Sequence, residues 1–344
     1  MKRSLIALAG VLALALSGGT AQAAGKLNIY NWFDYMPQEL LDKFAKQYDV
    51  EVTMDTYDSN ESLLARLKAG VTGYDIAVPT DYMVAILKKE DLLAKTEPNK
   101  MSNFKNMEPD WIDVYWDPGR EYSIPYQWGT TSFMVDSAVY AGDINTLAIL
   151  FDPPTELSGK INMLKDVNEV LNAGLRYLGY PRCNDNPEQL KKLNELLVNA
   201  KKHWLSFNSD GAKEVLVSGD AAAGMIWNGF GMRARAEKAT LKYAYPKEGF
   251  TGWMDNIVVL KGAPNLENAK KFQNFMMVPE NAAALTNFAR YTAGIKGVKP
   301  FLDAELAAAP EVNVPPDAPK PEFVPPCKDE VIRFYDRIWT NLLK

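Results

Sequence analysis

Apolar residues recur at two different periods along the first third of the chain. Short runs of β-branched and aromatic residues predict strands, and apolar positions three or four residues apart, such as Leu40, Leu41 and Phe44, predict amphipathic helices. The predicted strands are residues 27–31, 50–56 and 75–78, and the predicted helices are residues 37–48, 60–69 (with Asn60 as its N-cap) and 82–89. This alternation is typical of an α/β protein with a mostly parallel sheet covered by helices on both faces.

A second unit with the same alternation follows. Its predicted elements are the strands 160–163 and 223–227 and the helices 167–178, 187–199 and 212–218; the extended segments 122–128 and 131–135 come before it and belong to the first unit. Residues 257–260 and 266–276 then resemble elements of the first unit again. The chain ends in a proline-rich stretch and a predicted amphipathic helix at residues 329–343. Two α/β lobes between which the chain crosses several times would explain why no single linker separates them.

The first 24 residues have the pattern of a secretory signal peptide. Lys2 and Arg3 precede an uncharged apolar run, and Ala21-Gln22-Ala23 has the form of a cleavage site. No other apolar run is long enough to cross a bilayer. We therefore predict that residues 1–24 are removed and that a soluble protein of about 320 residues is exported to a bacterial periplasm.

Charge and cysteine content restrict the partners of the exported chain. Removing Lys2 and Arg3 takes the formal charge down by two, from −5 to −7, and no Lys/Arg cluster interleaves with aromatic residues. Nucleic acid and anionic lipid are therefore not expected partners. Cys183 and Cys327 can form one disulfide in an oxidising compartment, but the sequence does not give their distance, so paired and free states both stay open.

The sequence contains few groups suited to catalysis. The single histidine, His203, lies at a predicted helix end, where a solvated or capping role is the commoner case. There is no Gly-x-Ser-x-Gly, no Gly-rich phosphate loop and no His–carboxylate metal spacing, and two cysteines with one histidine cannot build a closed zinc site. An exported hydrolase that uses two carboxylates needs no motif and remains an alternative, but we expect no enzyme, cofactor or metal.

Aromatic residues beside polar or charged residues occur repeatedly where predicted strands end. In open α/β sheets, ligands bind outside the carboxyl ends of the strands. Aromatic faces attract ammonium groups, and carboxylates fix the position of the nitrogen. Such a combination suits a slim ligand with an apolar middle and cationic ends, although any one tryptophan alone is more readily explained by core packing. The segments concerned are Trp32-Phe33-Asp34-Tyr35, Thr80-Asp81-Tyr82, Trp227-Asn228-Gly229-Phe230, Trp253-Met254-Asp255 and Arg290-Tyr291.

Asp166 and Glu169 form a further candidate pair near a predicted helix start. At a spacing of three residues they share one helix face and could both point at an amine. The alternative is that acids in a first helical turn complement the helix dipole. The residues alone favour this alternative.

Together these segments resemble the periplasmic spermidine/putrescine-binding proteins of ABC importers. The resemblance covers essentially the whole exported chain, with the motifs in the same order. Those motifs are Asn31-Trp32-Phe33-Asp34-Tyr35, Tyr74-Asp75-Ile76-Ala77-Val78-Pro79-Thr80, Ile124-Pro125-Tyr126-Gln127-Trp128-Gly129-Thr130, Phe207-Asn208-Ser209-Asp210, Trp227-Asn228-Gly229 and Trp253-Met254-Asp255.

The resemblance implies a two-lobed periplasmic-binding-protein fold (type II-like) with a ligand cleft between lobes joined by two crossover strands. We expect residues 25–130 and 255–299 to form the N-terminal lobe, and residues 131–254 and 300–344 to form the C-terminal lobe. The implied function is capture of a putrescine- or spermidine-type polyamine and its delivery to an ABC permease in the inner membrane. Receptors that dock on a permease are usually monomers, so a monomer is expected.

The resemblance also assigns roles to individual residues. Asp166 and Glu169 match the pair that holds one amine end of the ligand. The resemblance therefore favours an amine-binding role for this pair over a role that only complements the helix dipole. Asp255 matches the acid near the inner amine, and Trp227 and Trp253 match the walls along the methylene chain. The remaining matches are the cleft residues Trp32, Asp34, Tyr35, Thr80, Tyr82 and Tyr291.

Several positions depart from the family pattern. Phe33 replaces a small hydroxyl residue, and Phe230 stands where putrescine-type members carry an acid and spermidine-type members a small residue. Arg233 and Arg290 lie close to site segments and could pair a ligand carboxylate. A receptor for 4-aminobutyrate or another small amine therefore remains an alternative. An iron-binding relative of this fold needs clustered tyrosines and usually histidine, which argues against that function here.

Overall fold

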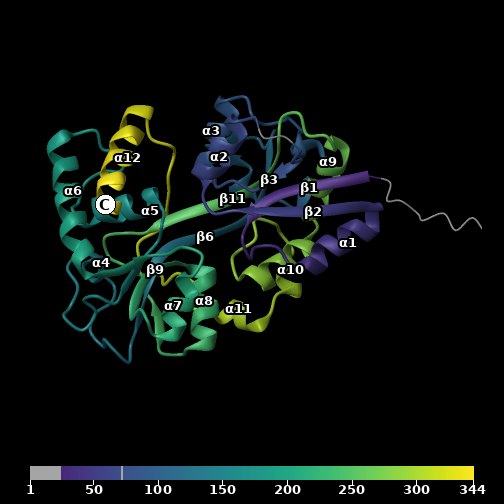
Figure 1. The fold of residues 1–344 in the computed structure, drawn as a ribbon. Helices are drawn as coiled ribbons and strands as arrows, with labels where there is room; N and C mark the ends of the chain where they lie inside the picture. The colour runs from purple at the N-terminus through teal and green to yellow at the C-terminus, as the bar shows by residue number, and fades with distance from the viewer. Residues whose placement is uncertain (1–24, 71–72) are drawn as a thin grey trace, which may run out of the picture.

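The computed structural model describes residues 25–70 and 73–344, so the predicted signal peptide lies outside the described residues. One ten-stranded sheet runs through the molecule in the order β2-β1-β3-β11-β6-β9-β7-β8, with β10 beside β6 and β12 beside β11 (Figure 1). The strands are β1 (Gly25–Trp32), β2 (Val50–Tyr57), β3 (Ile76–Ala77), β6 (Ser123–Asp136), β7 (Ile161–Met163), β8 (Trp204–Phe207), β9 (Ala223–Trp227), β10 (Leu241–Tyr243), β11 (Thr251–Val259) and β12 (Glu322–Phe323). A separate two-stranded sheet pairs β4 (Asp113–Val114) with β5 (Asp117–Pro118).

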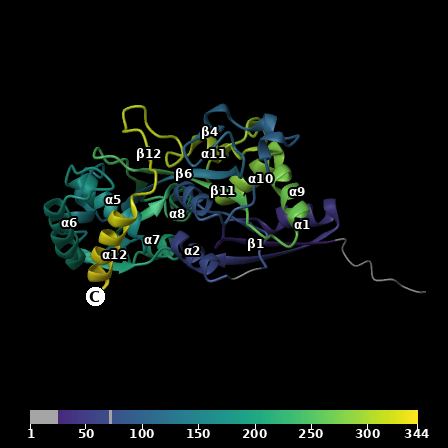
Figure 2. The same ribbon diagram turned by 90° about the horizontal axis from the view of Figure 1, so that it is seen from above.

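Helices cover this sheet in both halves, and α12 packs on α5 and α6 at the end far from β1 (Figure 2). They are α1 (Gln38–Tyr48), α2 (Asn60–Lys68), α3 (Asp81–Lys89), α4 (Ala148–Phe151), α5 (Val167–Tyr177), α6 (Pro187–Ala200), α7 (Ala212–Ser218), α8 (Asn228–Glu237), α9 (Leu266–Met276), α10 (Pro279–Ala289), α11 (Ala304–Ala308) and α12 (Asp329–Leu343). None of the helices in the described ranges is long and apolar enough to cross a membrane.

The strands β6 and β11 connect the two halves of the sheet. They pair antiparallel with each other, while β11 continues onto β3 on one side and β6 onto β9 on the other (Figure 1). Every residue of β11, and every residue of β6 except Trp128, is buried. Strands buried on both faces lose the alternation of apolar and polar residues. This explains why the sequence predicted two separate pieces of β6 and only the last part of β11.

The hydrophobic core is divided in the same way. One large cluster draws its buried residues from between Phe133 and Phe250 and from α12. A second large cluster uses residues between Leu27 and Tyr126 and between Trp253 and Ile295. Each half therefore buries its own apolar surface, as independent lobes do. The boundaries at 130/131, 254/255 and 299/300 stay a prediction.

The structure differs from the sequence analysis in one helix cap and in several elements that were not predicted, among them α8, α10 and β8. Ser59, and not Asn60, caps α2, because its hydroxyl accepts from the Ser62 N–H at 3.2 Å. The side chain of Asn60 turns toward Thr80 instead. Helix α8 was not expected, because its first four residues include two glycines and the segment has no apolar stripe with helical spacing.

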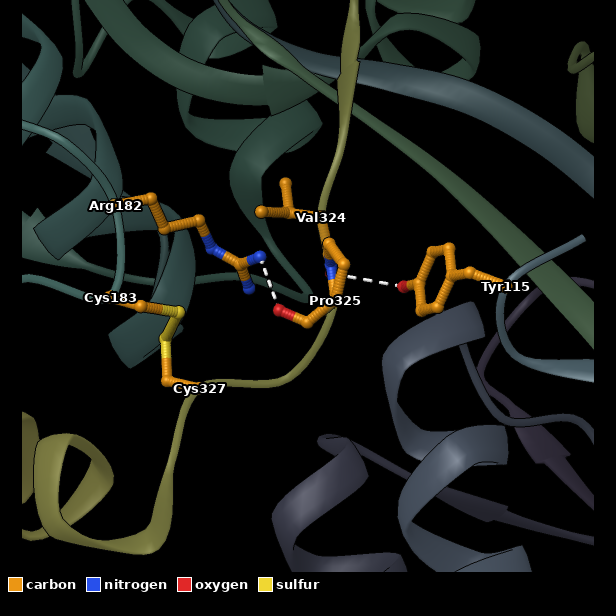
Figure 3. Close-up of a disulfide and its surroundings, with 6 residues drawn as sticks. All are labelled: Tyr115, Arg182, Cys183, Val324, Pro325 and Cys327. Atoms are coloured by element: carbon orange, nitrogen blue, oxygen red, sulfur yellow. Dashed lines mark hydrogen bonds between the residues drawn. A yellow bond between two sulfur atoms is a disulfide. The ribbon is translucent and has the colours of Figure 1, made fainter.

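Residues 322–327, called the crossover segment below, pass between the two halves a third time. β12 lies parallel to the start of β11, and the Tyr115 hydroxyl donates to the Val324 carbonyl at 3.0 Å. On the other side, Arg182 donates to the Pro325 carbonyl at 2.6 Å, and Cys183 and Cys327 form a disulfide with a Cα–Cα distance of 5.1 Å (Figure 3). The question left open by the sequence is thus answered: the two cysteines are paired and hold the C-terminal region against the middle of the chain.

Candidate ligand-binding site

A cavity opens between the two halves, where β1, β3 and β9 end. Its volume is about 790 Å³ when the open solvent at its mouth is included. Aromatic and acidic side chains dominate its surface. The lining residues are Trp32, Phe33, Tyr35, Tyr57, Asp58, Asn60, Thr80, Tyr82, Asp166, Asn168, Glu169, Asp210, Trp227, Phe230, Trp253, Asp255 and Tyr291.

The structure brings together every residue singled out from the sequence except Asp34. Asp34 has a φ of 50°, and this left-handed turn directs its carboxylate to Arg233 at 2.6 Å instead of into the cavity. Both bulky departures from the family pattern, Phe33 and Phe230, do line the cavity. Phe33 is 61% exposed, which places it at the mouth.

Asp255 supplies a carboxylate in the buried part of the cavity. It is 5% exposed, and the Thr80 hydroxyl donates to it at 2.7 Å. Asn60 positions Thr80 by donating to its hydroxyl at 3.0 Å. Burial raises the pKa of Asp255 to about 7, and the Thr80 hydrogen bond opposes this rise. A buried carboxylate of this kind is stabilised by an opposite charge, which an ammonium group can supply.

Aromatic rings form the walls beside Asp255. Trp253 and Tyr291 meet edge to face with ring centroids 5.1 Å apart, and Tyr35 meets Tyr291 in the same way at 5.5 Å. The Trp253 indole N–H is buried and has no hydrogen-bond partner among the described residues. The Tyr35 hydroxyl is buried beside Asp255, where it opposes the rise in the pKa of that carboxyl. The indole N–H can therefore contact a ligand in addition to the ring faces.

A second acidic region comes from the start of α5. Asp166 caps this helix by accepting from the Glu169 N–H at 3.0 Å, while Glu169 accepts from the Thr131 hydroxyl at 2.8 Å. Burial and, after it, the Asp166 charge raise the pKa of Glu169 to about 7. Burial also raises the pKa of Asp166, and the N–H groups that it caps oppose the rise. Capping and cavity lining are thus combined in one pair of acids.

The sequence did not single out five lining residues: Tyr57, Asp58, Asn60, Asn168 and Asp210. Three of them lie just at or after the end of β2, where the same rule about strand ends could have found them. Asp210 lies within a segment that carries the family resemblance. Asn168 had no signal in the sequence: its side chain donates at 3.3 Å to Glu61, which also accepts from the Tyr82 hydroxyl at 3.0 Å.

The charges that line the cavity all have one sign. Asp58, Asp166, Glu169, Asp210 and Asp255 contribute carboxylates, and no lysine or arginine is among the described lining residues. In the described ranges, no group of three or more His, Cys, Asp or Glu side chains is placed to hold a metal ion. The site is therefore suited to an organic cation.

The two arginines near the site are both engaged elsewhere. Arg233 contacts Asp34, and Arg290 contacts Asp303, each at 2.6 Å. Neither guanidinium lines the cavity. The structure therefore provides no free cation within the described lining to receive a ligand carboxylate.

Comparison with known proteins agrees with this geometry. The family described as "Bacterial extracellular solute-binding protein" matches residues 39–314, and the chain belongs to that family. Within it, the chain belongs to the spermidine/putrescine-binding group. It is 34% identical to the spermidine/putrescine-binding periplasmic protein of Escherichia coli K12, over 89% of this chain and 87% of the relative. It is 33% identical to the putrescine-binding periplasmic protein SpuD of Pseudomonas aeruginosa UCBPP-PA14, over 96% and 97%.

Solved structures confirm the predicted periplasmic-binding-protein fold. The spermidine/putrescine ABC transporter substrate-binding protein PotD of Streptococcus pneumoniae aligns with a TM-score of 0.78 at 29% identity, covering 93% of this chain and 99% of that one. The Tp0655 (TpPotD) lipoprotein of Treponema pallidum aligns with a TM-score of 0.82 at 26% identity, covering 92% and 99%. Membership of a family of extracellular solute-binding proteins also confirms the predictions of a transport receptor, of a location outside the cytoplasm and of a protein that is not an enzyme.

Proposed function

We propose that this protein captures a polyamine of the putrescine or spermidine type in the periplasm and delivers it to an ABC permease. The observation that carries the proposal is the one-signed charge of the cavity: five carboxylates and no lysine or arginine among the described lining residues. Between the acids stand aromatic walls, which suit the methylene chain of such a ligand. Relatives whose names state spermidine, putrescine or cadaverine binding, at 30–34% identity over most of the chain, support the same ligand class.

Each end of the ligand has its own acids in this proposal. Asp255, held by Thr80, receives one ammonium group beside Tyr35, Tyr291 and Trp32. Asp166 and Glu169, beside Tyr82, receive another. Trp227 and Trp253 flank the methylene chain between them, where each favourable cation–π contact with the adjacent ammonium groups adds about 0.5–2 kcal/mol.

In this proposal the two lobes close around the ligand. Ligand contacts from both halves favour the closed arrangement over the open one, so that binding drives closure. The closed monomer is then the form that docks on the permease. A receptor for 4-aminobutyrate has little support, because Arg233 and Arg290, which could have paired its carboxylate, are held by Asp34 and Asp303.

Native mass spectrometry of the protein, purified from the exporting host without denaturation, tests this proposal. We expect an added mass that matches a diamine or triamine and disappears after unfolding and refolding. A bound amino acid, sugar or carboxylate of fixed mass would contradict it. Sedimentation of the same sample tests the monomer.

A further inference from the structure

The ion pair between Asp34 and Arg233 joins opposite sides of the cleft. Asp34 lies in the turn after β1, and Arg233 comes from α8, nearly two hundred residues later in the chain. Their carboxylate and guanidinium are 2.6 Å apart, with side-chain exposures of 35% and 25%. The pair is thus partly shielded from solvent, and its net charge is zero.

The guanidinium of Arg233 also contacts two aromatic rings. It lies over Phe230 at 5.3 Å from the ring centroid and over Phe288 of α10 at 6.0 Å. Its Nη1 is buried and has no hydrogen-bond partner among the described residues, so it is held by one hydrogen bond and two ring faces. Phe230 lines the cavity, whereas Arg233, which contacts its ring, does not.

The neighbours of Asp34 show how close this corner is to the ligand. Phe33 and Tyr35, on either side of it in sequence, both line the cavity, and so does Trp32. Burial raises the pKa of Tyr291, another lining residue; the Arg233 charge opposes this rise and the Asp34 charge adds to it. Without Arg233, the Asp34 carboxylate would therefore be an acid at the edge of the cavity.

We propose that Arg233 is a specificity-determining residue, because its guanidinium occupies the Asp34 carboxylate and supports Phe230. The protein thereby supplies its own cation at this corner of the cleft, and the ligand does not need one there. The acids that remain are those at Asp255 and at Asp166/Glu169, with Asp58 and Asp210 also in the lining. This arrangement favours a short polyamine and disfavours one that would place a further ammonium group at Asp34. The inference rests on the proposed function, since it names which polyamines the same cavity prefers.

Calorimetric titration of putrescine and spermine into the ligand-free full-length exported chain tests the inference. The Arg233→Ala variant should change the ratio of the two affinities by about tenfold in favour of spermine, because one charge-assisted hydrogen bond becomes available to the ligand. Loss of the bridge between the halves weakens closure for both ligands alike, so it cancels in the ratio. The double variant Asp34→Asn/Arg233→Ala should return the ratio to that of the unmodified protein.

Two further variants keep the test interpretable. Arg290→Ala removes an ion pair of the same length and similar exposure that does not line the cavity, and should leave the ratio unchanged. Arg233→Lys keeps the positive charge and should also leave the ratio of the two affinities unchanged. An unchanged ratio in Arg233→Ala, or a shift that persists in the double variant, would overturn the inference. Failure of the unmodified protein to bind either polyamine would instead overturn the proposed function.

Discussion

The Thr80 hydroxyl donates a 2.7 Å hydrogen bond to Asp255, a residue 175 positions later in the chain. Thr80 stands at the start of α3, whereas Asp255 lies on the crossover strand β11, which runs between the halves. The contact therefore fixes an acid on the element about which the halves would move. Its carboxylate is buried, oriented and without a positive partner among the described lining residues.

Asp255→Asn should weaken polyamine binding strongly. The substitution keeps the shape and the hydrogen bond from Thr80 but removes the charge that pairs with the ligand ammonium, at a cost of about 2–5 kcal/mol. Calorimetry measures the loss directly. Asp210→Asn, at an exposed position of the lining, is the matched control and should cost much less. An affinity for Asp255→Asn equal to that of the unmodified protein would remove Asp255 from the ligand site.

Polyamine binding should release protons near pH 6. Asp255 and Glu169 have pKa values raised to about 7 without ligand, so both are partly protonated there. An ammonium ligand favours the ionised carboxylates and expels those protons. Titrations in buffers with different ionisation enthalpies count the protons released. The number should fall toward zero above pH 8, and Asp255→Asn should lower it at pH 6. Equal heats in all buffers at pH 6 would contradict this account.

The ligand-free protein should lose stability as the pH rises from about 4 to about 7. The carboxylates of Asp81 and Asp255 have an ordinary pKa of 3.8 and a folded-state pKa of about 7, chiefly because they are buried. The folded state therefore binds more protons than the unfolded state within this window, and each pH increase favours unfolding. Urea denaturation at a series of pH values checks the slope. A saturating polyamine should make the free energy of unfolding less dependent on pH. A stability that rises from pH 4 to pH 7 without ligand would refute the raised pKa values of Asp81 and Asp255.

Removal of the disulfide should destabilise the protein by about 2–5 kcal/mol, because the bond closes a loop of more than a hundred residues. The sequence separation of Cys183 and Cys327 is 144. Chemical denaturation of the double variant Cys183→Ser/Cys327→Ser and of the unmodified protein gives the difference in their free energies of unfolding. The unmodified protein treated with a reductant should match the variant. We also expect faster ligand dissociation, because the crossover segment then loses its covalent link to residue 183 and keeps weaker contacts on that side, such as the Arg182 hydrogen bond and the Arg176–Glu322 ion pair. No loss of stability would show that the cross-link does not constrain the chain.

Gly229→Ala should impair binding although the residue does not line the cavity. A Cβ at this position would stand 2.6 Å from the Tyr291 ring and 2.7 Å from the Ala289 carbonyl oxygen, so Tyr291 would have to move. Gly231→Ala in the same helix is the control, since its nearest contact would be 3.1 Å from the Tyr243 ring. Affinity should fall for the first variant by more than tenfold, a typical effect of displacing a positioning contact. Equal affinities would show that Tyr291 is not needed in its present position.

Much of this fold follows from the sequence because local patterns and tertiary environment agree. Helices α7, α9 and α12 begin and end where their apolar spacing predicts. The crossover strands were less clear, since complete burial erases the alternation that marks a strand. Helix α8 has glycines where a helix usually has strong formers, and only its packing explains it.

The residues of the candidate site also fall into those that the sequence could predict and those that it could not. Acids and aromatic residues at strand ends could be found because the topology of an α/β sheet brings those ends together. Asn168 could not be found from the sequence, because its role depends on its contact with Glu61 of the other half across the cleft. Asp34 shows the opposite problem: it has the right type and place in the sequence, but a left-handed turn and a distant arginine decide where its carboxylate points.

The most direct test of the central claim is calorimetric titration of the unfolded and refolded, ligand-free protein with putrescine, spermidine, cadaverine and 4-aminobutyrate. A cavity lined by five carboxylates and no lysine or arginine among its described residues should bind at least one of the diamines or the triamine, and should not bind 4-aminobutyrate measurably. Binding of 4-aminobutyrate alone, with no heat from any polyamine, would contradict the account.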